Sequence, residues 1–157
     1  RFVMGVSYIY LLYGFVGPIA GKANGKVVLL FTLAIIFFGD TAAYFVGKKW
    51  GKVKLWPELS PGKTVEGAIG GLAGSVLAAL LIWIIFGLIL KTGFPFWKSL
   101  IVGLLAAPLG QAGDFLESLM KRAAGRKDSG TLVPGHGGIL DRTDGFVFVL
   151  PLVYFLF

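Results

Sequence analysis

The stretch Val65–Leu90, VEGAIGGLAGSVLAALLIWIIFGLIL, carries one acidic residue near its start and no basic residue. About 20 apolar residues are enough to cross a bilayer as an α-helix, and a water-soluble fold would have to expose much of such a run. The whole chain follows this trend, because its 157 residues are 56% hydrophobic and 15% charged. Soluble domains are about 45–50% apolar and about 25% charged. We therefore predict an all-α fold, a polytopic integral membrane helix bundle.

Similar apolar segments lie on both sides of this stretch, separated by Gly and Pro residues that are typical of loops. The predicted membrane helices are five, at about Phe2–Ala20, Val27–Gly47, Val65–Leu90, Trp97–Gly125 and Gly138–Phe157. The chain begins at Arg1 without an initiator Met and ends inside an apolar run at Phe157. We expect residues 1–157 to form a single transmembrane domain that is the C-terminal half of a longer protein.

Basic residues predict the orientation of these helices. The four loops carry two, five, two and five Lys or Arg residues in chain order. By the positive-inside rule, the loops at about residues 48–66 and 121–140 face the cytoplasm. The formal net charge of +7 does not indicate nucleic acid, because the cations form no stripe among exposed aromatic residues. Since the sequence has no cysteine, metal ligands and nucleophiles are limited to His, Asp, Glu and hydroxyl groups.

Acidic residues are scarce, with only eight in the chain, and Asp40 and Asp114 fall within predicted membrane helices. Asp40 and Asp114 each cost at least ~2.5–3.5 kcal/mol in that position, which makes a functional role the default hypothesis. The alternative is a carboxylate that reaches the membrane surface or pairs with Lys across helices.

Two pairs of carboxylates repeat one helical spacing. The pairs are Asp114 and Glu117, which share a helix face with Ser118 and Lys121, and Asp141 and Asp144. Pairs near one membrane depth can hold one or two hard cations, and Mg²⁺ prefers one or two carboxylates with substrate phosphates completing its shell. The pattern would suit phosphoryl or nucleotidyl transfer.

The segment between these pairs is rich in cations and glycines. It reads Lys121-Arg122-Ala123-Ala124-Gly125-Arg126-Lys127-Asp128-Ser129-Gly130 and then Pro134-Gly135-His136-Gly137-Gly138. Glycines let backbone N–H groups approach an anion closely, and the cations can balance phosphate charge, so we predict a phosphate-binding loop. An ordinary positive-inside loop would explain the cations but not Gly-His-Gly-Gly so close to Asp-Arg-Thr-Asp. His136 is either a structural hydrogen-bonding residue or a contact to phosphate or metal.

The other basic loop contains Ser60-Pro61-Gly62-Lys63-Thr64-Val65-Glu66-Gly67 and follows Gly39-Asp40-Thr41. A P-loop is rejected, because the first glycine of that motif is missing and no buried strand leads into it. Ser60 or Thr64 is a candidate cap for the next helix, with Glu66 in its first turn, and this purely structural role is the alternative to a functional one. The N-terminus of that helix would still attract phosphate.

The longest motif resembles the signature of the phosphatidate cytidylyltransferase family. It consists of Ser118-Leu-Met-Lys121-Arg122, four residues, Lys127-Asp128-Ser129-Gly130, and Pro134-Gly135-His136-Gly137-Gly138-Ile139-Leu140-Asp141-Arg142-Thr143-Asp144. The segments Gly39–Thr41 and Ser60–Gly67 are also similar to that family, so the resemblance covers most of the chain from about Gly39. Val133 and Gly145 depart from the usual residues at their positions, and neither position is a charged one in the family pattern.

The resemblance implies a membrane-embedded, Mg²⁺-dependent enzyme. In such an enzyme the phosphate of phosphatidic acid attacks the α-phosphorus of CTP, which releases pyrophosphate and leaves CDP-diacylglycerol. One or two divalent cations are expected, with room for a monovalent cation. The implied partners are CTP, phosphatidic acid, membrane lipid and a second copy in a homodimer, without nucleic acid. In a bacterium the protein would lie in the inner membrane with its active site facing the cytoplasm.

The resemblance also suggests roles for individual residues. The expected metal ligands are Asp114, Asp141 and Asp144, and these form the expected catalytic set together with Lys121 and Arg122. Phosphates of CTP or phosphatidic acid are expected to bind Lys63, Thr64, Ser118, Lys127, Asp128, His136, Gly137, Gly138 and Arg142. Further candidates are Asp40, Glu66 and Glu117.

Two other functions fit parts of the pattern. A CTP-dependent membrane kinase for lipids or polyprenols would share the cations and carboxylates, but it would release CDP instead of pyrophosphate. A transporter for phosphate or lipid anions also predicts acids within the membrane and helices broken by glycine. It would move its substrate without consuming CTP.

Overall fold

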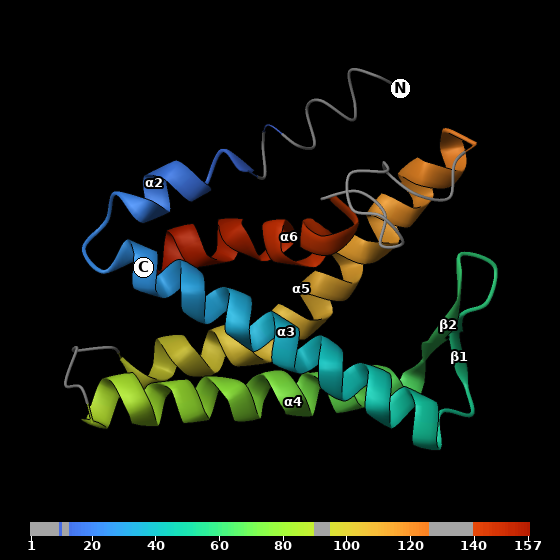
Figure 1. Ribbon diagram of the computed structural model, residues 1–157, viewed down its shortest axis with the longest axis horizontal. Helices are drawn as coiled ribbons and strands as arrows, with labels where there is room; N and C mark the ends of the chain where they lie inside the picture. The colour runs from blue at the N-terminus through green and yellow to red at the C-terminus, as the bar shows by residue number, and fades with distance from the viewer. Residues whose placement is uncertain (1–9, 11–12, 90–94, 126–139) are drawn as a thin grey trace.

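The computed structural model describes residues 10, 13–89, 95–125 and 140–157, with the side chains of residues 140–142 left out. The helices and strands are α2 (Val16–Ala20), α3 (Gly25–Trp50), β1 (Lys54–Trp56), β2 (Ser60–Thr64), α4 (Val65–Trp83), the π-helix η1 (Ile84–Ile89), α5 (Phe96–Ala123) and α6 (Leu140–Leu156). Long helices run across one another, and the small hairpin stands where α3 ends and α4 begins (Figure 1). The predicted all-α membrane fold is confirmed, with one small addition in the hairpin.

Three helical segments are long and apolar enough to cross a membrane: Gly25–Trp50, Val65–Ile89 and Phe96–Ala123. They match the second, third and fourth predicted spans to within a few residues. The fifth predicted span corresponds to α6, a shorter apolar helix. Most of the first predicted span lies outside the described residues, and its described end forms the short helix α2.

Small residues set the packing of α4 between its neighbours. Its buried positions are Gly67, Gly71, Ser75, Ala78 and Ala79, and such residues let helix backbones approach closely in a membrane. The Ser75 hydroxyl donates a hydrogen bond of 2.7 Å to the Gly103 carbonyl of α5. The close packing holds α3, α4 and α5 together along their length.

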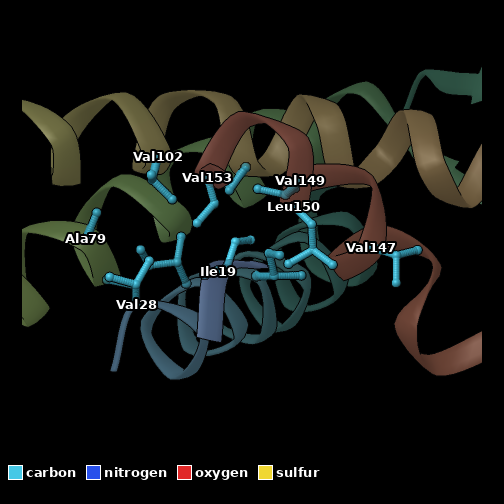
Figure 2. Packing of buried hydrophobic residues seen from close by; sticks show 12 residues of the cluster. Ile19, Val28, Ala79, Val102, Val147, Val149, Leu150 and Val153 are labelled. Atoms are coloured by element: carbon cyan, nitrogen blue, oxygen red, sulfur yellow. The ribbon is translucent and has the colours of Figure 1, made fainter. Parts of the chain in front are cut away.

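Apolar side chains of α2, α3, α4, α5 and α6 pack together in one core. Figure 2 shows Ile19, Val28, Val102, Leu150 and Val153 pointing into one shared interior. Ile19, Leu150 and Val153 are fully buried. This packing fixes α6 against α5 and α3, and so determines where the acidic start of α6 lies.

The two-stranded hairpin was not predicted. Its strands are antiparallel, with Lys54 opposite Thr64, Trp56 opposite Ser60, and an irregularity between these pairs. β1 has only three residues, and all three are exposed. It therefore cannot show the alternation of buried and exposed residues by which strands are recognised. The loop predicted at about residues 48–66 is therefore partly ordered as a sheet.

Candidate active site

A cavity of about 800 Å³ opens where α3, the hairpin, α4 and α5 meet. Its polar and charged lining residues are Asp40, Tyr44, Lys48, Lys54, Lys63, Thr64, Gln111 and Asp114. Four glycines, Gly47, Gly51, Gly62 and Gly67, contribute backbone to the wall. The cavity thus joins the first basic loop, through Lys48, Lys54 and Lys63, to Asp40 of α3 and Asp114 of α5.

An ion pair between β2 and α5 lies at the centre of this region. The Lys63 Nζ is 2.5 Å from the Asp114 Oδ2, and about a third of each side chain is exposed (29% and 31%). The same ammonium lies 4.6 Å from the centre of the Phe115 ring. Asp40 of α3 is within electrostatic range of both Lys63 and Asp114. Two of the predicted intramembrane acids therefore belong to one site.

A second acidic group adjoins the first at the α5–α6 contact. The Asp144 carboxyl is within electrostatic range of both Glu117 and Asp114. Its Oδ1 also accepts a 2.9 Å hydrogen bond from the backbone N–H of Gly145. Glu117 is 2% exposed, and its Oε2 is 2.8 Å from the Lys121 ammonium. Four acids and two lysines thus form a continuous charged network.

Glycines bring α5 and α6 together at this network. A Cβ on Gly145 would lie 3.3 Å from the Asp114 Oδ1 and 3.4 Å from the Gly110 Cα. A Cβ on Gly113 would lie 2.7 Å from the Asp144 carbonyl oxygen, well inside contact distance. The departure from the family pattern at Gly145 is therefore at a close helix contact, where a larger residue would press on Asp114.

Thr64 and Glu66 have structural contacts of their own. The Thr64 hydroxyl accepts a 3.1 Å hydrogen bond from the N–H of Gly67, which confirms Thr64 as the N-cap of α4. The Glu66 carboxylate accepts hydrogen bonds from the backbone N–H groups of Lys52 and Val53 at 3.0 and 3.3 Å. Both residues therefore tie the hairpin to the start of α4, whereas Thr64 also lines the cavity.

Other predicted site residues are only partly placed. Ser118 is half-buried on α5 and Arg122 is exposed near the end of that helix. Asp141 and Arg142 belong to the first turn of α6, and their side chains lie outside the description. Lys127, Asp128, His136, Gly137 and Gly138 fall in 126–139, outside the described residues. Their predicted roles stay predictions.

The sequence reasoning missed some of the cavity wall. Gln111 lines the cavity beside Asp114, and its position one helical turn before Asp114 was a signal that could have identified it. Lys54 and Leu55 reach the cavity from β1. They gave no such signal, because their placement depends on the unpredicted hairpin.

The whole chain, residues 1–157, matches the sequence profile of the Cytidylyltransferase family. The chain belongs to this family. The resemblance inferred from its motifs is thereby confirmed.

Curated proteins provide a second comparison for this cytidylyltransferase family member. Phosphatidate cytidylyltransferase of Bacillus subtilis is 47% identical over 132 residues, which are 84% of this chain and 48% of that protein. The phosphatidate cytidylyltransferase of Staphylococcus saprophyticus is 42% identical over 154 residues, 98% of this chain and 57% of the relative. That of Staphylococcus aureus is 44% identical over 156 residues, with the same coverage. The chain spans about half the length of these relatives.

Proposed function

We propose that this chain carries the reaction site of a phosphatidate cytidylyltransferase, which converts CTP and phosphatidic acid to CDP-diacylglycerol and pyrophosphate. The observation that carries the proposal is the Lys63–Asp114 pair in a cavity that is also lined by Asp40 and by the Ser60–Gly67 segment. Family membership and the names of the relatives support the same reaction. The three apolar helices support a membrane location, where a lipid substrate is available.

The proposed chemistry requires positioning and charge balance, and it needs no nucleophile from the protein. A phosphate oxygen of phosphatidic acid forms a bond to the α-phosphorus of CTP, and the bond from that phosphorus to the bridging oxygen of the β-phosphate breaks. Pyrophosphate leaves with the electron pair. Lys63 and Lys121 can balance phosphate charge, and Arg122, Lys127 and Arg142 are the further candidates for this role. Held in a site of fixed charges, the two substrates react without reorganising water.

Asp114 and Asp144 are the proposed ligands for a divalent cation, with Asp141 as a third. Their oxygen donors suit Mg²⁺, which is commonly held by one or two carboxylates and completed by substrate phosphates. Among the described residues, no three His, Cys, Asp or Glu side chains are grouped so as to hold a metal by themselves. The substrate phosphates are proposed to complete the shell of the cation. When bound, Mg²⁺ would act as a Lewis acid on phosphoryl oxygens.

We also propose that the site faces the cytoplasm, where CTP is found. The basic residues beside the cavity, such as Lys48 and Lys54, agree with this orientation by the positive-inside rule. The homodimer expected from the family resemblance is part of the proposal, and crosslinking of the full-length protein in membranes tests it.

The test is release of pyrophosphate from CTP by the purified full-length protein, with and without phosphatidic acid and Mg²⁺. Release that requires both components, with CDP-diacylglycerol as the lipid product, is the expected result. Formation of CDP would instead indicate a kinase. Intact CTP with movement of a lipid anion across vesicles would indicate a transporter.

A further inference from the structure

The base of the hairpin is joined to α4 by a compact set of hydrogen bonds. Val53 uses both of its backbone groups there, because its carbonyl accepts a 2.9 Å bond from the Val65 N–H and its own N–H donates to Glu66. The Glu66 Oε2 accepts from both Lys52 and Val53, at 3.0 and 3.3 Å. One carboxylate oxygen thus accepts hydrogen bonds from two successive backbone N–H groups, just before β1 begins.

The other side of the hairpin rests on α5. The Trp56 ring of β1 contacts the Phe115 ring, with centroids 5.6 Å apart. Lys63 of β2 lies over the same Phe115 ring, at 4.6 Å, and pairs with Asp114. The reach of Lys63 into the cavity therefore depends on the angle at which the hairpin leaves α4.

Glu66 is not needed to begin α4, because Thr64 already caps that helix through the Gly67 N–H. Its carboxylate points instead to backbone N–H groups at the foot of β1. A carboxylate oxygen accepts hydrogen bonds only, and with its two lone pairs it can accept from two neighbouring N–H groups at once. The contact suits a rigid connection between the hairpin and α4.

We propose that Glu66 is a positioning residue, which holds the β1–β2 hairpin in the orientation that brings Lys63 to Asp114. The catalytic readout of this proposal rests on the proposed function. The positioning itself can be tested without catalysis.

Two substitutions separate the reach of this side chain from its charge. Glu66→Gln keeps the length and one carbonyl oxygen, which can accept from both N–H groups as Oε2 does. Glu66→Asp keeps the charge but withdraws the oxygens by one methylene. If Glu66 acts by positioning, the Gln variant keeps kcat/KM within about threefold, whereas the Asp variant loses about tenfold or more, since small displacements of catalytic groups are costly. An Asp variant more active than the Gln variant would overturn the proposal in favour of a role for the charge. Equal losses would also overturn it, because the reach of the side chain would then not decide the activity.

Limited trypsin digestion in detergent gives the independent measurement. Lys52 and Lys54 flank the contact with Glu66, and both are exposed. Cleavage after these residues should be faster in Glu66→Asp and unchanged in Glu66→Gln. Glu58→Gln, which removes an exposed charge elsewhere on the hairpin, is the matched control and should resemble the wild type in both assays.

The two hypotheses fail in different ways. If the wild-type protein releases no pyrophosphate, the proposed function fails, while the trypsin pattern still decides whether Glu66 holds the hairpin. If pyrophosphate is released but the Asp variant is cleaved no faster than wild type, the positioning role is wrong and the proposed function stands.

Discussion

Asp114 connects the two halves of the charged network. It pairs with Lys63 from the hairpin and is an electrostatic neighbour of Asp40 on α3 and Asp144 on α6. An ionised acid within a membrane helix is costly, and the Lys63 ammonium offsets part of that cost. Because about a third of each side chain is exposed, the pair contributes little to stability, about 0–1 kcal/mol. Its proposed role is therefore in the chemistry of the cavity.

Replacing Asp114 by Asn tests this assignment at the scale of one residue. The amide keeps the shape of the side chain but removes the charge that is proposed to hold a cation, so turnover should fall by about 100-fold or more. The thermal midpoint should change little, because the Lys63 pair is partly exposed. The measurement is formation of CDP-diacylglycerol by the purified full-length variant beside Glu58→Gln. Full activity of Asp114→Asn would contradict the proposed metal site, as would full activity of Asp141→Asn.

Thr64 offers a residue-scale prediction about stability. Thr64→Val keeps the shape of this buried side chain but removes the acceptor for the Gly67 N–H. Loss of an N-cap costs about 1 kcal/mol, so the thermal unfolding midpoint in detergent should drop. Thr64→Ser keeps the hydroxyl and should restore much of the loss. A Val variant as stable as the Ser variant would show that the cap does not contribute.

At the scale of elements, the contact between α5 and α6 decides where Asp144 lies. Gly113 faces the Asp144 carbonyl and the Phe148 side chain, with less room than a methyl group needs. Gly110 lies one turn earlier and faces Gly145. A Cβ on Gly110 would lie 3.8 Å from the Gly145 Cα, which is an ordinary contact distance. Two glycines on one helix thus differ in what they permit.

Gly113→Ala should therefore be harmful and Gly110→Ala mild. The first variant places a Cβ 2.7 Å from backbone, so α6 must move, at an expected cost of about 1–3 kcal/mol. Activity should fall with stability, because Asp144 moves with α6. Thermal unfolding and turnover of both variants check the prediction. Equal behaviour of the two would mean that α5 and α6 are not packed as described.

At the scale of the whole molecule, successive long helices run in opposite directions, which brings separate segments of the chain to one end of the bundle. The end of α3, the start of α4 and the charged part of α5 all line the same cavity, and the hairpin stands at that end (Figure 1). The loop between α2 and α3 joins the opposite end of α3. The basic residues and the cavity thus lie at the same end, the one proposed to bind the substrates.

Labelling of introduced cysteines tests the orientation. Glu58→Cys on the hairpin and Ala23→Cys before α3 are both exposed positions. We expect a membrane-impermeant maleimide to label Glu58→Cys in inverted vesicles only and Ala23→Cys in right-side-out vesicles only, because the basic loop remains inside. The full-length protein is used on a background without other reactive cysteines. The reverse pattern would place the cavity on the outer face.

Much of the helical fold was predictable, whereas the site was predictable only in part. Apolar runs longer than a bilayer requires identified α3, α4 and α5, and the spacing of Asp114, Glu117 and Lys121 identified one face of α5. The observed bond between Lys121 and Glu117 follows from that spacing. The hairpin and the contribution of Gln111 were missed, since neither a three-residue strand nor a single amide produces a periodic signal.

The sequence by itself determined the membrane helices, the basic loops between them and the family motifs, because hydrophobic length and residue spacing are local properties. Only the tertiary structure decided that Lys63 meets Asp114, that Asp144 adjoins Glu117, and that Glu66 binds the foot of the hairpin. These contacts join residues on different elements, and they depend on how closely glycine-rich helix faces approach. Helical spacing cannot specify such distances, since it relates a residue only to neighbours on its own helix.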